Sequence, residues 1–272
     1  MITCPACLHE LDNPPVILRK RTKERADVEF YFCPRCDLVF HTEPIPADYY
    51  DAQYRQELEG VTTVTEEILN EQRNRAMALM PYLEPIVEKA GIFTSLDIGC
   101  GTGALPLMLW EKLRLDVAGV EPSIDYRAYA RAQGLTVYPN LDDVTGKYDL
   151  VTCIHMLEHL REPRPFLEKL TRIARIVMIE VPNVMNCMGA CGYVHPLAFN
   201  ETSLYNLLAA TGWAPGWILH YWGIYPNLKK PQYLLAVAAV GEADRTAAMA
   251  GSLSMGLSSY NTLMGPPPEL TR

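Results

Sequence analysis

The stretch FTSLDIGCGTGALPLMLW, residues 93–110, decides the fold that this sequence predicts. Its first six residues have the composition of a short β-strand, Gly99, Gly101 and Gly103 follow, and the apolar run after them is typical of a helix. A strand, a glycine loop and a helix N-terminus in this order open a nucleotide-binding β–α–β unit, because glycine lets the backbone approach a ligand without a Cβ clash. The sequence therefore predicts an α/β fold with a ligand crevice at the end of this strand.

Two carboxylates indicate which ligand the glycine loop accepts. Gly99, Gly101 and Ala104 satisfy the dinucleotide-binding pattern on their own, so the loop alone does not decide. Asp97 lies two residues before the first glycine, where it would repel a pyrophosphate and favour a cationic amino-acid group. The next predicted strand ends at Glu121, 22 residues after Gly99, in a position to accept hydrogen bonds from ribose hydroxyls.

Together these motifs resemble the class I S-adenosylmethionine-dependent methyltransferases. The resemblance extends over residues 65–240 and also rests on the stretches YDLV, residues 148–151, and MLEHL, residues 156–160. It implies a Rossmann-like seven-stranded sheet, mostly parallel with one reversed strand, and a cofactor lying across the carboxyl ends of the strands. The cofactor-binding residues that it implies are Asp97, Gly99, Gly101 and Gly103 for the methionine part, Glu121 for the ribose, and Asn140, Leu141 and Asp142 for the adenine edge, with Cys100 and Pro122 beside them.

Two CxxC pairs near the N-terminus predict a metal site. Cys4 and Cys7 are separated from Cys33 and Cys36 by 25 residues, and each two-residue spacer lets a tight turn direct both sulfurs at one ion. Four thiolates fill a tetrahedral zinc site, so we expect a structural zinc ribbon; iron in the same cage, or a metal-free or redox pair, are the alternatives. The ribbon also resembles the N-terminal zinc-binding module of methyltransferases from sugar, surface-polysaccharide and natural-product pathways.

The charge distribution does not favour a nucleic-acid partner. The chain has a formal net charge of -8, and its first 45 residues hold six basic against seven acidic residues. A basic run, RKRTKER at residues 19–25, lies between the two CxxC pairs. We expect it to be a solvated hairpin tip, and RNA contact is the alternative.

The chain divides into four predicted parts. These are a zinc ribbon over residues 1–45, a linker and helices over 46–90, a class I methyltransferase domain over 91–242 and a tail over 243–272. A capping-box spacing at Thr63 and Glu66 marks the start of the helical part.

The longest apolar run, residues 234–240, is far shorter than the roughly 20 residues of a membrane span. We therefore expect a cytoplasmic enzyme with no membrane contact; its oligomeric state, a homodimer included, is open.

Histidines and a glutamate follow the strand that ends near residue 154. If residues 155–159 begin a helical turn, His155, Glu158 and His159 share one face, and His195 closes over the same crevice. Three interpretations stay open. His155 or His159 acts as a general base; Glu158, His159 and His195, with His155, bind a second divalent metal; or the group is a structural helix start. The metal interpretation rests on a resemblance to the Glu/His clusters of small-RNA terminal 2′-O-methyltransferases and ubiquinone-pathway O-methyltransferases, where His155 replaces a Glu.

These observations combine into one functional prediction. We expect a methyl transfer from S-adenosylmethionine to an O, C or N atom of a small polar metabolite, namely a sugar nucleotide, a polysaccharide unit or a natural-product intermediate. His155, His159 and His195 are the predicted catalytic residues. The alternatives are an RNA methyltransferase that uses the ribbon for binding, and a non-catalytic adaptor that only binds the cofactor.

Overall fold

The computed structural model describes residues 1–20, 28–46, 49, 63–225 and 227–241. Most of the predicted linker, the basic hairpin beyond Lys20 and the predicted C-terminal tail lie outside these residues.

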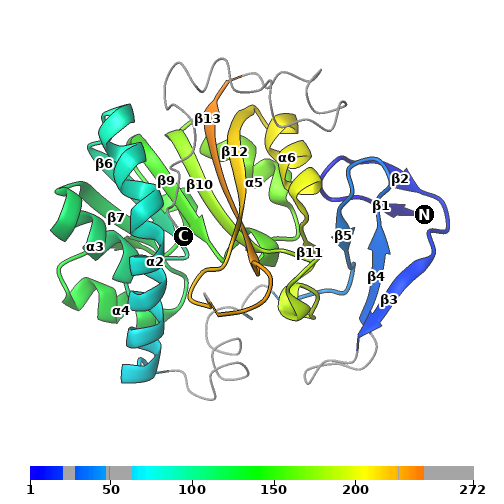
Figure 1. Ribbon diagram of the computed structural model, residues 1–272, viewed down its shortest axis with the longest axis horizontal. Coiled ribbons are helices and arrows are strands. Elements are labelled where there is room, and N and C mark those ends of the chain that lie inside the picture. Colours follow the sequence, from blue (N-terminus) through cyan, green and yellow to red (C-terminus); the bar gives the residue numbers. More distant parts are fainter. Residues whose placement is uncertain (21–27, 47–48, 50–62, 226, 242–272) are drawn as a thin grey trace.

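A seven-stranded sheet forms the centre of the molecule, in the order β12-β13-β10-β9-β6-β7-β8 (Figure 1). The parallel strands are β6 (Thr94–Ile98), β7 (Asp116–Val120), β8 (Thr136–Tyr138), β9 (Tyr148–Ile154) and β10 (Ala174–Pro182). Strand β13 (Tyr233–Val240) runs antiparallel to both of its neighbours, β10 and β12 (Trp213–Tyr221). The described sheet therefore has one reversed strand, and the predicted fold class is confirmed.

Helices cover both faces of this sheet. On one face, α2 (Glu66–Ala90) and α3 (Ala104–Leu113) pack against side chains of β9, β10, β12 and β13; α4 (Ile124–Ala132) lies beside α3 through a small apolar cluster. Helix α2 begins at Thr65, whose side chain accepts the Ile68 N–H at 3.4 Å, rather than at the predicted Thr63. It ends at Gly91, whose φ of 58° lies in the left-handed region that favours glycine.

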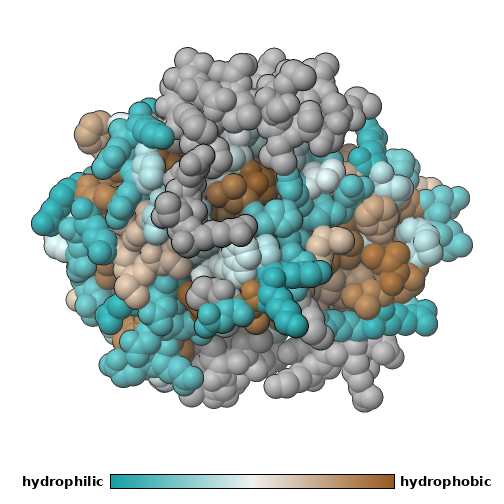
Figure 2. Space-filling model, in the orientation of Figure 1, coloured by the Kyte–Doolittle hydropathy of each residue, from teal (hydrophilic) through white to brown (hydrophobic). Residues whose placement is uncertain are grey.

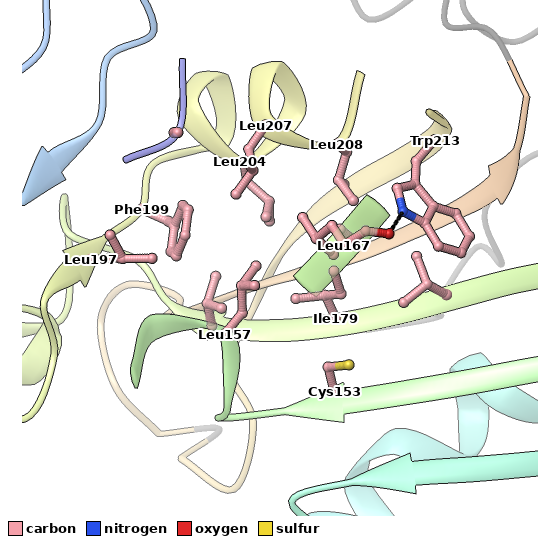
Figure 3. Packing of buried hydrophobic residues seen from close by; sticks show 14 of the residues in the cluster. Cys153, Leu157, Leu167, Ile179, Leu197, Phe199, Leu204, Leu207, Leu208 and Trp213 are labelled. Carbon is pink, nitrogen blue, oxygen red and sulfur yellow. Dashed lines mark hydrogen bonds between the residues drawn. The ribbon is translucent and has the colours of Figure 1, made fainter. Parts of the chain in front are cut away.

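The opposite face packs against α5 (Pro163–Leu170) and α6 (Glu201–Ala210). Figure 3 shows Leu204, Leu207 and Leu208 of α6 directed toward Leu167 of α5 and toward the sheet. The buried indole of Trp213 donates a hydrogen bond to the Leu167 carbonyl at 3.1 Å, which satisfies its only polar atom inside this core. Helix α6 begins with a capping box, which Asn200 and Ser203 form.

The N-terminal module is built from short strands. A hairpin of β1 (Ile2–Thr3) and β2 (Glu10–Leu11) precedes β3 (Val16–Lys20), β4 (Val28–Phe32) and β5 (Val39–Phe40). The last three form a four-stranded sheet with β11 (Leu197–Ala198), a strand that comes from far later in the chain (Figure 1). Buried residues of the module, including all but one of its CxxC cysteines, belong to the apolar cluster that also contains α5 and α6. The module and the central domain thus share both a sheet and a core.

The surface of the N-terminal module carries exposed apolar side chains. Figure 2 shows brown, hydrophobic surface on this side of the molecule, and Leu8, Ile17, Leu18 and Phe32 are exposed there. None of the helices in the described ranges is long and apolar enough to span a membrane.

Candidate active site

A cavity of about 590 Å³ opens at the carboxyl ends of β6, β7 and β9, beneath α2. This is the edge of the sheet where a parallel α/β fold binds its ligands. The predicted cofactor residues that line it are Asp97, Gly99, Cys100, Gly101, Glu121, Pro122, Asn140, Leu141 and Asp142. Gly103 is the one that does not line the cavity; it is the N-cap of α3. The fold therefore brings nine of the ten predicted cofactor residues to one cavity.

Gly101 is the most constrained position of the glycine loop. Its φ is 56°, and a Cβ there would lie 2.6 Å from the side-chain oxygen of Gln72. Its N–H donates a hydrogen bond to Glu121 Oε2 at 2.8 Å. A larger residue at this position would clash with α2 as well as strain the backbone.

Glu121 joins the glycine loop to the end of β7. While Oε2 accepts from Gly101, Oε1 accepts from the Ser123 N–H at 3.0 Å, and the side chain is buried. The same carboxylate lines the cavity. Glu121 therefore has a structural role in the loop, in addition to the ribose contact that the sequence predicts.

Asp97 is a buried carboxyl at the floor of the cavity. Its Oδ1 accepts a hydrogen bond from Thr152 Oγ1 at 2.6 Å, across the β6–β9 pair. Burial raises the pKa of Asp97 to about 7, with a further increase from Glu121, although the Thr152 hydrogen bond opposes the shift. A cationic group placed beside Asp97 would therefore stabilise its ionised form.

The region predicted to bind adenine is a short 3₁₀ turn, η2 (Leu141–Asp143). Asn140 precedes it and donates from Nδ2 to Asp143 Oδ2 at 3.1 Å. The Asp142 side chain is largely exposed and pairs with Lys169 of α5. This turn borders the cavity near its rim, where an exposed ligand edge would contact it.

Helix α2 contributes cavity residues that the sequence alone did not indicate. Gln72 Oε1 accepts hydrogen bonds from the Thr102 N–H at 2.9 Å and from Thr102 Oγ1 at 2.8 Å. Arg75 lies one turn further along and pairs with Glu71 at 3.1 Å. The signal that could have found them is the helical spacing of residues 68, 72, 75, 76 and 79, which all line the cavity.

Cys100 contributes its backbone rather than its thiol. The side chain packs with Ala130, Leu135 and Val137 in a buried cluster. A Cβ on Gly119 would lie 2.4 Å from the Cys100 sulfur, so β7 needs glycine at that position. Cys100 therefore acts as a small apolar residue beneath the loop.

His155 does not begin a helical turn. Its φ of 52° is left-handed, and the 3₁₀ turn η3 covers only Leu157–His159. The imidazole lies between two buried carboxylates, with Nε2 2.7 Å from Glu180 and Nδ1 3.3 Å from Glu158. Burial lowers the pKa of His155, but its contacts with Glu158 and Glu180 outweigh this and raise it above the ordinary value. A protonated His155 ring would compensate charge on both carboxylates.

His159 and His195 meet through a different arrangement. Their ring centroids are 4.7 Å apart, and ligand atoms of Glu158, His159 and His195 all lie within 4.8 Å of one another. His159 Nδ1 is 2.7 Å from the Val194 carbonyl, and His195 Nδ1 is 2.8 Å from the Gly189 carbonyl. Because a carbonyl only accepts, each Nδ1 is the protonated nitrogen, and the lone pair of the neutral ring is on Nε2.

The electrostatics of this group favour neutral imidazoles. Burial lowers the pKa of His159 to about 4 against the opposing effect of Glu158, and burial also lowers the pKa of His195. His155 and His159 are among the residues that line the cavity, and His195 is not. The fold thus brings all three predicted histidines together around Glu158.

The donor set fits a divalent metal. Glu158 is 1% exposed, and among the described residues neither of its carboxylate oxygens has a well-directed hydrogen-bond donor. Two imidazoles and a carboxylate are ligands that divalent transition metals accept, and hydrogen bonds from Nδ1 to carbonyls are typical of metal-binding histidines. A cation beside Glu158 would compensate its buried negative charge, because the single His155 ring lies between two carboxylates, Glu158 and Glu180.

The four CxxC cysteines converge as the sequence predicts. Their sulfurs all lie within 4.8 Å of one another, with Cys4 and Cys36 3.6 Å apart and Cys7 and Cys33 3.5 Å apart. Tetrahedral zinc with Zn–S bonds of about 2.3 Å places neighbouring sulfurs about 3.8 Å apart, so the spacing fits this metal. The hydrogen bond from Cys36 lowers the pKa of Cys4 to about 5, which favours a thiolate in the group.

Comparison with known proteins identifies the family. A family model described as a methyltransferase domain matches residues 66–215, which is more than half of the chain. The chain belongs to the methyltransferase domain family. The matched residues include the glycine loop, Glu121 and the group of His155, Glu158, His159 and His195, here called the histidine cluster. The predicted class of protein, a methyltransferase, is confirmed.

Two curated relatives match part of this methyltransferase domain. The ubiquinone biosynthesis O-methyltransferase of Methylococcus capsulatus is 35% identical over 92 residues, which cover 30% of this chain and 38% of that protein. The ajmaline N-methyltransferase of Rauvolfia serpentina is 32% identical over 91 residues, which cover 29% of this chain and 31% of that protein. The match thus spans less than two fifths of either relative.

Solved structures share the fold of this methyltransferase. The magnesium protoporphyrin IX methyltransferase from Synechocystis PCC 6803, with bound SAH, has a TM-score of 0.53 at 16% identity and covers 71% of this chain and 97% of that chain. A SAM-dependent methyltransferase from Archaeoglobus fulgidus has a TM-score of 0.50 at 18% identity; the match covers 69% of this chain and 98% of that chain. At these identities the likeness establishes the fold alone.

Proposed function

We propose that this chain transfers a methyl group from S-adenosylmethionine to a hydroxyl oxygen of a small polar metabolite. The observation that carries the proposal is one cavity that is lined both by Asp97 and the glycine loop, here called its cofactor end, and by His155 and His159, here called its acceptor end. Methyl transfer needs the two reactants aligned in one enclosed space, since the sulfonium is already activated. Sugar nucleotides, polysaccharide units and natural-product intermediates are the acceptor classes that we propose.

The cofactor end fits S-adenosylmethionine in its charge and its shape. Buried Asp97 faces the cavity, where the cofactor's ammonium and sulfonium would favour its ionised form. At Gly101 the absence of a Cβ leaves room for the Gln72 side chain, which also lines the cavity, against the loop. In this proposal Glu121 also contacts the ribose, and the residues from Asn140 to Asp142 contact the adenine.

The acceptor end supports proton removal from a hydroxyl. His159 lines the cavity, and its carbonyl-bonded Nδ1 leaves the Nε2 lone pair as its acceptor. Alternatively, the same lone pair would join Glu158 and His195 in holding a divalent metal, which when bound lowers the pKa of a coordinated hydroxyl. His155 lies between Glu158 and Glu180, which favour its protonated form, and it is therefore a less suitable base than His159.

The N-terminal cysteines would hold a structural zinc ion. Four protein ligands leave no open coordination position, so this metal stabilises the module and takes no part in the chemistry. In the described part of the basic run, Arg19 pairs with Glu29 at 2.8 Å and Lys20 contacts the Cys191 carbonyl. Both cations are thus partnered within the chain, which favours a small-molecule acceptor over RNA.

Titration calorimetry with S-adenosylhomocysteine and with Mn²⁺ tests the two ends separately. Wild-type protein is expected to bind both, Asp97→Ala to lose the first, and Glu158→Gln to lose the second while keeping the first. Unchanged affinity of Asp97→Ala for S-adenosylhomocysteine would refute the cofactor assignment. A wild-type protein that binds no divalent ion beyond zinc would refute the metal and leave His159 as the general base.

A further inference from the structure

We infer that the N-terminal module positions the acceptor end of the active site, and that His41 is the residue through which it does so. The inference rests on the proposed function and concerns the segment from Cys191 to Ala198. This segment carries His195 and the Val194 carbonyl that orients His159. Its backbone is held mainly by residues of the N-terminal module.

His41 holds the segment at two points. Its Nε2 is 3.0 Å from the Tyr193 carbonyl, and its backbone N–H donates to the Pro196 carbonyl at 3.0 Å. Val194 and His195 are the two residues between these points. These two hydrogen bonds, here called the clamp, therefore flank the Val194 carbonyl, which accepts from His159, and His195 itself.

The direction of the His41 side-chain bond is settled by its other nitrogen. The Glu43 N–H donates to His41 Nδ1 at 3.1 Å, so Nδ1 is the acceptor and Nε2 carries the proton. The ring is 4% exposed and packs edge-on against Phe30 with centroids 5.2 Å apart. Burial lowers the pKa of His41 to about 4, and the ring is a neutral, fixed donor to Tyr193.

Further contacts extend the clamp in both directions. Strand β11 pairs with β5 through Leu197 opposite Phe40, directly beyond Pro196. The Tyr193 hydroxyl donates to the Pro44 carbonyl at 2.8 Å, and the Lys20 ammonium contacts the Cys191 carbonyl. Residues from three parts of the module thus bond to one short segment of the central domain.

The clamp continues to the cysteine site. Cys33 and Cys36 lie at the turn that precedes β5, where the Cys33 N–H donates to the Leu38 carbonyl and the Asp37 N–H donates to the Cys33 carbonyl, both at 2.9 Å. His41 directly follows β5. A metal that fixes this turn therefore fixes the strand from which His41 reaches the active site.

The clamp acts on one end of the cavity only. At the cofactor end, Asp97 accepts from Thr152, and Glu121 accepts from Gly101 and Ser123. None of these three donors belongs to the N-terminal module. Loosening His41 should therefore alter the histidine cluster and leave cofactor binding unchanged. This separation distinguishes a positioning residue from one that only stabilises the fold.

The test compares His41→Phe, which keeps a ring but removes both nitrogens, with His41→Gln, which keeps a side-chain N–H donor. Tyr31→Phe is the matched control, because it removes a hydrogen bond to Glu29 within the same sheet rather than one to the segment. The readouts are zinc content, S-adenosylhomocysteine affinity, and the solvent-exchange rate of the His159 Nδ1 proton by ¹⁵N-edited NMR.

We expect His41→Phe to keep zinc and S-adenosylhomocysteine binding while its His159 Nδ1 proton exchanges at least about tenfold faster, since the accepting Val194 carbonyl is no longer held. His41→Gln should restore part of the protection, and Tyr31→Phe should match the wild type. An unchanged His159 exchange rate in zinc-loaded His41→Phe would overturn the inference.

A second variant covers the case in which His41→Phe does not fold. Tyr193→Phe removes the hydroxyl that donates to Pro44 and should change the exchange rate of the His159 Nδ1 proton in the same direction by a smaller factor. No change in that variant would equally count against the clamp. None of these readouts needs methyl transfer. A wild type that fails to bind S-adenosylhomocysteine therefore refutes the proposed function, whereas the exchange rates alone support or refute the clamp.

Discussion

Glu121, at the end of β7, accepts a hydrogen bond from the backbone N–H of Gly101 at 2.8 Å and thereby holds the loop that follows β6. The same carboxylate accepts from Ser123, the N-cap residue of α4. One side chain thus connects two neighbouring strand ends at the cofactor side of the cavity. A residue that would bind the ribose also determines the shape of the loop that would bind the methionine part.

Replacing Glu121 should therefore affect both binding and stability. In Glu121→Ala the Gly101 and Ser123 N–H groups lose their buried acceptor, at a cost of about 1–3 kcal/mol each. We expect a lower midpoint of thermal unfolding together with weaker S-adenosylhomocysteine binding. Glu121→Gln keeps one side-chain oxygen and should be intermediate. A weakened affinity with an unchanged unfolding midpoint would show that the carboxylate does not support the loop.

Asp97 should make cofactor affinity depend on pH. Its pKa is raised to about 7, so below pH 7 the ligand-free carboxyl is mostly protonated. A cationic ligand favours the ionised form, so binding releases a proton, and affinity should rise with pH up to about 7 and level off above it. Calorimetry in two buffers of different ionisation enthalpy measures that proton. Asp97→Asn should bind weakly with a flat profile between pH 6 and 8; a wild-type profile equally flat would contradict the assignment.

Gly119 should be intolerant of a methyl group. A Cβ there would lie 2.4 Å from the buried sulfur of Cys100, and overpacking of this kind costs about 1–3 kcal/mol. Gly119→Ala should lower the free energy of unfolding by that amount, and Cys100→Ala in the same chain should recover much of it. Gly192→Ala is the control, since its Cβ meets nothing within 4 Å. Additive effects of the two substitutions in denaturant unfolding would contradict the contact.

Cys33→Ser should release the proposed zinc. Removing one of four thiolates opens the coordination sphere, and elemental analysis should fall from one zinc per chain toward none. Because β5 pairs with β11, loss of the ion should also lower the unfolding midpoint. Cys187→Ser, which alters a half-buried thiol outside the CxxC pairs, should keep its zinc. Full zinc retention in Cys33→Ser would exclude Cys33 as a ligand.

Local spacing made much of the cofactor end and the cysteine site predictable. The glycine loop and each CxxC pair lie within one turn, and Glu121 lies at the end of the strand that directly follows the loop and its helix, so short motifs indicated these positions. For the histidines, the helical turn expected over residues 155–159 was wrong at His155, whose backbone is left-handed. The side chains come together instead through η3 and the hydrogen bond from His159 to the Val194 carbonyl.

The contacts that sequence could not predict are those between distant segments. His41 and Tyr193 are 152 residues apart, and β11 is a two-residue strand without a periodic pattern of its own. Gln72 reaches Thr102 only because α2 packs over the glycine loop. Such contacts depend on how whole elements pack, which residue spacing does not encode.

The most direct measurement of the central claim is label transfer from S-adenosylmethionine carrying an isotopically labelled methyl group. Wild-type protein, a pool of small hydroxylated metabolites and mass spectrometry would identify the product and the labelled atom. We predict label on an oxygen of a small polar molecule, none with Asp97→Ala, and a large loss with His159→Ala, which should still bind S-adenosylhomocysteine. No labelled small molecule from the wild type, or undiminished labelling by His159→Ala, would contradict the proposed methyl transfer.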